Sequence, residues 1–151
     1  SWAVRFSCSG CLVFYHGCLI HWFSKMQKSV SLSSAEAEYH GAMMTGRDLV
    51  WLRDLLTDLC VVLDRAVVLW SDSKSAVDMA FDPVAFKQTK HILRAAEFLR
   101  DLVHREVLVM RHLPGRVMLA DLLTKAVTRA IYAELMQLFA RYSQDGIVCP
   151  T

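Results

Sequence analysis

The sequence has 151 residues, of which 54% are hydrophobic and 21% are charged, and its formal net charge is +2 with histidine neutral. A chain of this length and hydrophobicity can build one substantial core, so we expect a single compact domain. The weak positive charge excludes a strongly basic nucleic-acid coat protein, and it neither indicates nor excludes other nucleic-acid binding.

A β-hairpin is predicted near the start of the chain. Two short runs rich in aromatic and β-branched residues, Leu12–Tyr15 and Leu19–Phe23, flank the segment His16-Gly17-Cys18. The apolar stretch that contains both runs is too short, and too polar at its centre, to span a bilayer. It also lacks the small-residue cleavage pattern of a signal peptide. We therefore expect an intracellular protein without a transmembrane segment.

The chain has five cysteines, and Cys8 and Cys11 form a Cys-x-x-Cys motif. A zinc ribbon needs a second such pair, and the sequence has none. The other cysteines have no partner spacing, and Cys18 and Cys60 sit in apolar stretches. We therefore expect reduced thiols rather than a metal or redox centre.

A long amphipathic helix is predicted after the hairpin. Ser33, with Glu36 three residues later, fits a capping box, in which a hydroxyl and a carboxylate satisfy backbone N–H groups at a helix start. Apolar residues then recur at spacings of three and four as far as about Leu59. They are Ala35, Tyr39, Ala42, Met43, Leu49, Leu52, Leu55, Leu56 and Leu59.

A buried strand and several shorter elements follow. The continuous apolar run Ala66–Trp70 predicts a strand buried on both faces, and it ends in Ser71-Asp72. The remaining sequence predicts helices over residues 73–81 and 89–104, a strand over 107–111, a turn at 113–115, a short helix over 118–125 and a last helix over 128–141. From residue 143 we expect a frayed tail. This order favours an α/β fold with a central mixed sheet flanked by helices.

Three carboxylates occupy unusual positions in this pattern. Glu38 lies in an early helical turn, Asp72 just past the buried strand, and Asp121 inside an apolar segment. Clustered carboxylates are hard oxygen ligands for Mg²⁺, and two such ions about 3.5–4 Å apart can promote phosphodiester hydrolysis. Each acid also has a structural explanation: the helix dipole for Glu38, a helix cap for Asp72 and an exposed helical position for Asp121.

The sequence around these acids contains several ordered blocks that span about residues 9 to 126. They are Ile20–Gln27, Val30–Tyr39, Val50–Arg53, Leu69–Ala76, Thr89–Ile92 and Leu119–Lys125. In this order they resemble the RNase H region of copia-type retrotransposon Pol polyproteins. The resemblance implies an RNase H-like fold over residues 1–126, with residues 127–151 as a C-terminal helix and tail of the same domain.

The same resemblance implies an activity and its requirements. It implies hydrolysis of the RNA strand of RNA:DNA hybrids with two Mg²⁺ or Mn²⁺ ions as cofactors. The implied partners are the hybrid and the upstream reverse transcriptase portion of the polyprotein. The implied location is the cytoplasm or a virus-like particle, away from membranes.

Site residues carry over position by position. Glu38 matches the family's helix glutamate, Asp72 the aspartate at the end of the central strand, and Asp121 the late aspartate, so these three are the implied catalytic metal ligands. Glu36 then keeps the capping role. His112 falls near a loop histidine thought to assist proton transfer or product release, although a surface histidine is the alternative. The implied phosphate contacts, each equally explicable as a solvated lysine, are Lys25, Lys28, Lys74, Lys87 and Lys90.

One departure concerns the first strand. The family carries a catalytic Asp two residues before an Asp-Trp-Ala segment, whereas this sequence opens with Ser1-Trp2-Ala3 and has a shortened loop after it. The first Asp would therefore lie upstream of Ser1, and the neighbouring strand of the sheet would lack a partner. We predict that these residues alone cleave poorly or not at all.

Three functional hypotheses follow from the sequence. The first is an RNase H domain that is active when upstream residues supply the missing Asp. The second is a degenerate copy that keeps the fold and at most binds nucleic acid or protein. The third is a helical partner-binding module that uses the face formed by Trp51, Leu52, Leu55 and Leu56.

Overall fold

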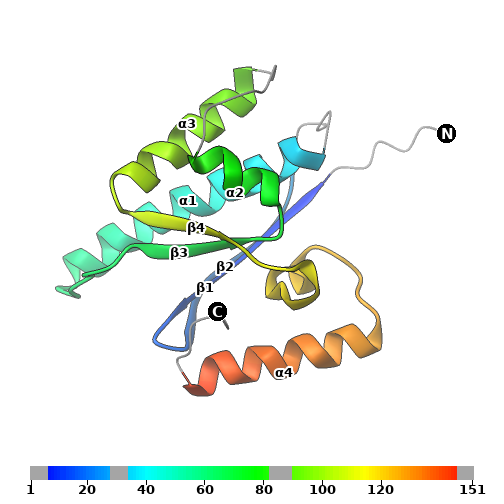
Figure 1. Cartoon of the computed structure of the whole chain (residues 1–151). Coiled ribbons are helices and arrows are strands. Elements are labelled where there is room, and N and C mark those ends of the chain that lie inside the picture. Colours follow the sequence, from blue (N-terminus) through cyan, green and yellow to red (C-terminus); the bar gives the residue numbers. More distant parts are fainter. Residues whose placement is uncertain (1–6, 28–33, 82–89, 146–151) are drawn as a thin grey trace. The chain divides into compact units, whose positions relative to one another are not determined.

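The structure is a computed structural model that describes residues 7–27, 34–81 and 90–145. Its elements in chain order are β1 (Cys8–Tyr15), β2 (Cys18–Met26), α1 (Ser34–Asp58), β3 (Val67–Ser71), α2 (Lys74–Phe81), α3 (Lys90–His104), β4 (Leu108–His112), the 3-10 helices η1 (Gly115–Val117) and η2 (Leu119–Leu123), and α4 (Arg129–Asp145) (Figure 1). The chain divides into two compact units. Unit 1 comprises Ser1–Val30 and Pro114–Thr151, and unit 2 comprises Ser31–Leu113.

The predicted α/β class and the predicted order of helices and strands are confirmed. In the described residues the strands form two two-stranded sheets, antiparallel β1–β2 and parallel β3–β4, instead of the one central sheet that we predicted. Each strand pairs with another strand of its own unit, which accounts for the difference. The predicted capping residue Ser33 lies outside the described residues. Among the helices that the structure describes, none is long and apolar enough to cross a membrane.

Unit 1 contains the hairpin, both 3-10 helices and α4. The hairpin turn places His16 at φ 47° and Gly17 at φ 77°, as a two-residue turn with left-handed backbone requires. Helix α4 packs on the hairpin through Phe14, whose ring centroid lies 5.6 Å from those of both Phe139 and Tyr142. The helix extends to Asp145, past its predicted end, so the expected frayed tail is wrong for residues 143–145.

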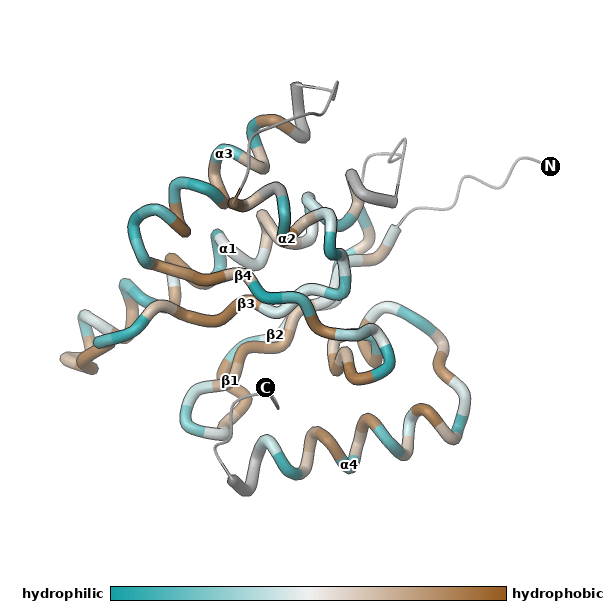
Figure 2. Tube along the Cα trace, viewed as in Figure 1, coloured by the Kyte–Doolittle hydropathy of each residue, from teal (hydrophilic) through white to brown (hydrophobic). Residues whose placement is uncertain are grey.

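Unit 2 packs three helices with the parallel strand pair. Its core cluster includes Tyr39, Leu99, Leu102, Leu108 and Met110, all at most 2% exposed. Figure 2 shows apolar colour along much of β3 and β4. All five residues of β3 are only half-buried, however, so the burial on both faces that we predicted for this strand is partial.

Helices α1 and α3 approach each other closely at Gly46. A Cβ atom at this glycine would lie 3.2 Å from Leu102 Cδ1 and 3.3 Å from Leu99 Cδ2. That separation is tighter than ordinary van der Waals contact, so the absence of a side chain at Gly46 lets the two helices pack at this distance.

Both long helices of unit 2 end in the same way. After α1, Cys60 has φ 60°, its N–H donates to the Thr57 carbonyl at 2.9 Å, and the Val61 N–H donates to the Leu56 carbonyl at 2.9 Å. This is the pattern of a Schellman motif, which satisfies the last carbonyls of a helix. Glu106, with φ 54°, ends α3 with the equivalent bonds.

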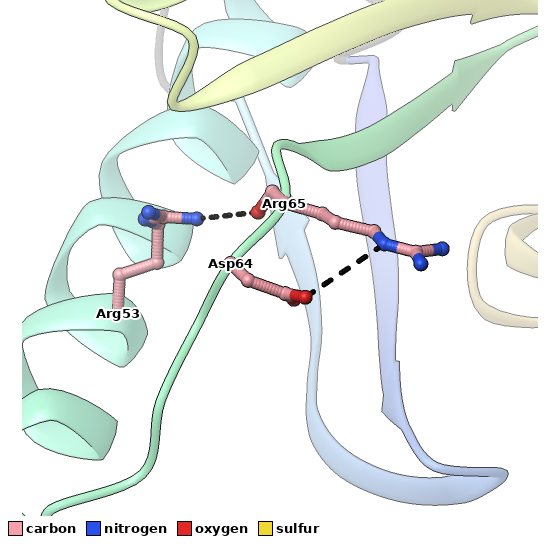
Figure 3. A network of polar contacts seen from close by, with 3 residues as sticks. All are labelled: Arg53, Asp64 and Arg65. Carbon is pink, nitrogen blue, oxygen red and sulfur yellow. Dashed lines mark hydrogen bonds and ion pairs between the residues drawn. The ribbon is translucent and has the colours of Figure 1, made fainter.

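The connection from α1 back to β3 is held by a side chain of the helix. Arg53 Nη1 donates a hydrogen bond of 3.1 Å to the Arg65 carbonyl (Figure 3). The neighbouring ion pair between Arg65 Nε and Asp64 Oδ2 is long, at 4.0 Å, and both side chains are highly exposed. Such a pair contributes little to stability, so the Arg53 bond is the contact that fixes this connection.

Candidate functional site

The carboxyl ends of β3 and β4 bring Asp72 and His112 to one edge of the parallel sheet. Ser71 is paired with His112 in the strand register, and Asp72 follows directly. The ladder continues one residue further, because the Leu113 N–H donates to the Ser71 carbonyl at 2.8 Å. Carboxyl edges of parallel strands are common places for ligand sites in α/β proteins. Asp72 is half-buried there and His112 is exposed.

Serine hydroxyl groups hold the backbone on both sides of Asp72. The Ser73 N–H donates to Ser71 Oγ at 3.2 Å, and Ser73 Oγ accepts from the Ala76 N–H at 3.3 Å. Ser73 is therefore the residue that caps α2, with its carbonyl accepting from the Val77 N–H at 3.2 Å. Ser73, and not Asp72, therefore caps α2, so helix capping does not explain the acid at position 72.

Helix α1 is tied by Tyr39 to the first turn of α2, just after the Asp72 loop. Its hydroxyl donates to the Ser75 carbonyl at 2.6 Å, and the side chain is 1% exposed. Burial raises the pKa of the Tyr39 phenol above its ordinary value, contact with Ser75 lowers it, and the charge of Asp78 raises it. The hydroxyl therefore stays protonated at neutral pH and remains a donor. Glu38, one residue before Tyr39, is exposed.

Asp121 belongs to unit 1 and has a cationic partner there. It lies in η2, and its Oδ1 is 2.9 Å from Lys125 Nζ, with the Asp121 side chain 19% exposed. The predicted short helix is a 3-10 helix, because the Asp121 N–H donates to the Met118 carbonyl and the Thr124 N–H to the Asp121 carbonyl. Lys125 compensates the partial burial of this carboxylate, which is less exposed than the exposed helical position that was its alternative explanation.

The hairpin fixes η2 through one of its faces. Ser24 Oγ donates to the Leu123 carbonyl at 2.7 Å, and Cys8 Sγ lies 3.9 Å from the same oxygen. Gly10 on β1 is paired with Ser24 in the strand register. A Cβ added at Gly10 would lie 2.6 Å from Thr124 Cγ2 and 3.1 Å from the Ala120 carbonyl oxygen. The position of Asp121 within unit 1 thus depends on a strand residue without a side chain.

We expect Gly10→Ala to destabilise the protein by about 1–3 kcal/mol, because the new methyl group forces η2 away from β1. Urea denaturation monitored by circular dichroism measures this change. The double variant Gly10→Ala/Thr124→Ser, which removes the nearest clashing atom, is expected to recover part of the loss. Full stability in Gly10→Ala would contradict the close approach.

The predicted phosphate-contact lysines are placed only in part. Lys25 is exposed on β2, with its Nζ 5.4 Å from the centroid of the Phe23 ring. Lys74 is exposed at the start of α2. Lys90 begins α3, but its side chain is not among those described. Lys28 and Lys87 lie outside the described residues.

The three predicted acids are divided between the two units. Glu38 and Asp72 belong to unit 2 and Asp121 to unit 1, and the two units are described separately. Within residues 7–27, 34–81 and 90–145, no three His, Cys, Asp or Glu side chains form a group that could hold a metal ion. The shared metal site stays a prediction.

The Cys-x-x-Cys motif lies on β1 with its two thiols in different surroundings. Cys8 is exposed and Cys11 is buried. Residues three apart on a strand point to opposite faces, so these thiols are poorly placed to share a ligand.

The sequence reasoning missed the residues that hold this region in place. Tyr39 was predicted only as an apolar helix residue, and no role was predicted for Gly10, Ser73 or Ser75. The motif Ser71-Asp72-Ser73 carried a signal for Ser73, since serine is a favoured cap before a helix. No local signal distinguishes Tyr39 or Gly10, because their contacts join distant parts of the sequence.

The sequence is similar to segments of three curated proteins, all of them retrotransposon Pol polyproteins. The chain is 34% identical over 139 residues to the Retrovirus-related Pol polyprotein from transposon TNT 1-94 of Nicotiana tabacum, covering 92% of this chain and 10% of that protein. It is 35% identical over 126 residues to the Pol polyproteins from transposons RE2 and RE1 of Arabidopsis thaliana, covering 83% of this chain and 9% of each. The chain thus spans about a tenth of the length of these relatives. No family model matches the sequence, and no solved structure matches it.

Proposed function

Because the chain is homologous over most of its length to a segment of copia-type retrotransposon Pol polyproteins, we propose that it is the ribonuclease H portion of such a polyprotein. The observation that carries this choice of segment is that Asp72 and His112 lie at one carboxyl edge of β3–β4, and that the following helix α2 is bonded to the turn of α1 that holds Glu38. An RNase H-like fold is part of the proposal.

The proposed cofactors are two Mg²⁺ or Mn²⁺ ions. Asp72 offers a half-buried carboxylate on a backbone that hydrogen bonds immobilise, and Glu38 offers an exposed carboxylate on the neighbouring helix. Such oxygen donors fit a hard divalent cation. When bound, the ions supply an activated water and stabilise the leaving oxygen of the phosphodiester. Asp121 is the third proposed ligand, once its carboxylate is released from Lys125.

The proposed substrate is an RNA:DNA hybrid. The exposed ammonium groups of Lys25 and Lys74 are available for phosphate contacts, and Lys28, Lys87 and Lys90 are proposed for the same role. Recognition of the RNA strand would rest on its 2′-hydroxyl groups. His112, exposed at the end of β4, is proposed to assist proton transfer or product release. The upstream reverse transcriptase portion of the polyprotein is the proposed protein partner.

The deciding experiment is cleavage of an end-labelled RNA:DNA hybrid in Mg²⁺ or Mn²⁺. The 151-residue chain and a version extended upstream are assayed together, with a DNA duplex of the same sequence as a control substrate. We expect the extended version to cut only the RNA strand of the hybrid, and the 151-residue chain to cut it weakly or not at all. If the extended version folds but does not cleave the hybrid, the proposed ribonuclease H activity is excluded.

A degenerate, non-catalytic copy is the second candidate. The ion pair of Asp121 with Lys125 favours it, because this carboxylate already has a cationic partner. Hybrid binding without cleavage by the extended version is the result that this candidate predicts.

The residues of the partner-binding face predicted on α1 differ in their exposure to solvent. Trp51 is 58% exposed and Leu55 39% exposed, whereas Leu52 is buried at 7%. Substitution of Leu52 by Asp would therefore damage the core and could not test partner binding. The exposed part of the face consists of Trp51 and Leu55.

A further inference from the structure

The segment from Ser71 to Ser75, which carries Asp72 and joins the end of β3 to the first turn of α2, accepts hydrogen bonds at the main-chain carbonyls of its two ends. Toward β4, the Ser71 carbonyl accepts the Leu113 N–H at 2.8 Å. Toward α1, the Ser75 carbonyl accepts the Tyr39 hydroxyl at 2.6 Å. Within this segment the hydroxyls of Ser73 and Ser75 lie 3.0 Å apart, so hydrogen bonds link the residue after Asp72 to the first turn of α2.

We propose that Tyr39 is a positioning residue for the acidic site: its bond to the Ser75 carbonyl sets the place of Glu38 relative to Asp72. This inference rests on the proposed function, since it assumes that the two carboxylates act together. Tyr39 is buried and does not itself contact substrate in this proposal. It acts through the backbone of α1, which carries Glu38, and of α2, which follows Asp72.

The geometry favours a positioning role over packing alone. Tyr39 fills the core with its ring, and the neighbouring core residues Ala42 and Ala76 are small. A phenylalanine would fill almost the same space, so packing does not require the hydroxyl. What the hydroxyl adds is a short polar contact between α1 and α2, from the residue that follows Glu38 to a residue three positions after Asp72. Metal ligands must be held within about 0.5 Å of their working positions, and one hydrogen bond at this point supplies such a constraint.

The first test is Tyr39→Phe with Mn²⁺ as the probe. Mn²⁺ broadens the NMR signals of nearby amides, and its affinity is read from the amides of Glu38 and Asp72. We expect Tyr39→Phe to remain folded and to bind Mn²⁺ about fivefold more weakly, the change that loss of one ordinary hydrogen bond produces. An affinity within twofold of the parent protein would overturn the inference, and so would a variant that does not fold, because Tyr39 would then be required for the fold.

Two control variants separate positioning from general effects. Tyr132→Phe makes the same chemical change at a half-exposed position on α4 and should leave Mn²⁺ affinity unchanged. Ala42→Gly weakens α1 at a buried position without touching the hydroxyl, so it should lower stability but leave the Mn²⁺ affinity of the folded protein unchanged. Equal losses of affinity in Ala42→Gly and Tyr39→Phe would point to a merely structural role and overturn the inference.

A metal-free measurement distinguishes failure of the inference from failure of the proposed function. Amide exchange of Ala76 and Val77, whose N–H groups bond Ser73, should quicken in Tyr39→Phe and not in Tyr132→Phe. If the parent protein shows no Mn²⁺ effect at Glu38 or Asp72, the proposed function fails. Faster amide exchange of Ala76 and Val77 in Tyr39→Phe would then still support the inferred coupling of Tyr39 to α2. Unchanged exchange would overturn that coupling.

Discussion

Asp72→Asn in the upstream-extended protein is expected to lower the rate of hybrid cleavage by at least about 100-fold. Asparagine keeps the shape of the side chain but removes the negative charge that would hold a divalent ion, and metal-ion catalysis contributes several kcal/mol to such reactions. The measurement is a single-turnover rate at saturating Mg²⁺ with enzyme in excess over a labelled hybrid.

Asp54→Asn is the matched control for this prediction. Asp54 is an exposed residue of α1 within the same unit, and the substitution makes the same change of charge. We expect its cleavage rate to stay within twofold of the parent rate. Hybrid affinity should be nearly unchanged in Asp72→Asn. A cleavage rate within tenfold of the parent in Asp72→Asn would remove Asp72 from the proposed metal site.

Leu99→Ala is expected to destabilise the protein by about 2–5 kcal/mol. Leu99 is 1% exposed and lies where α3 meets Gly46 of α1, so its truncation leaves a cavity in a tightly packed contact. A loss of this size is a large share of the stability of an ordinary domain. Equilibrium denaturation with urea measures it.

Leu93→Ala on the same helix provides the comparison for Leu99. Its side chain is 41% exposed, so the same substitution removes few buried contacts and should cost less than about 1 kcal/mol. Equal losses at the two positions would contradict the packing of α3 against α1.

Local patterns in the sequence were sufficient to predict most of the secondary structure. The hairpin is determined by His16 and Gly17 between two apolar runs, and α1 by apolar spacing that continues to its last turns. The 3-10 form of η2 escaped prediction, because its bond from the Thr124 N–H to the Asp121 carbonyl differs from an α-helical bond by only one residue.

The candidate site was predictable in its acids but not in its supports. Asp72 and Asp121 stood out because carboxylates beside apolar runs are unusual. The contact of Tyr39 with Ser75 joins residues 36 positions apart in the sequence, and that of Ser24 with Leu123 joins residues 99 apart. Spacing within a helix or strand carries no information about such contacts.

The division of the chain has a consequence for the order in which it folds during synthesis. Unit 2 is one continuous segment, Ser31–Leu113, whereas unit 1 draws on residues from both sides of it. The hairpin leaves the ribosome first but must wait for Leu123 and Phe139 before its faces are covered. Contacts that close a long loop form slowly, and prior folding of unit 2 shortens that loop. Nascent chains stalled when Leu113 has left the ribosome exit tunnel but η2 has not should therefore protect unit 2 from protease while leaving the hairpin open to cleavage.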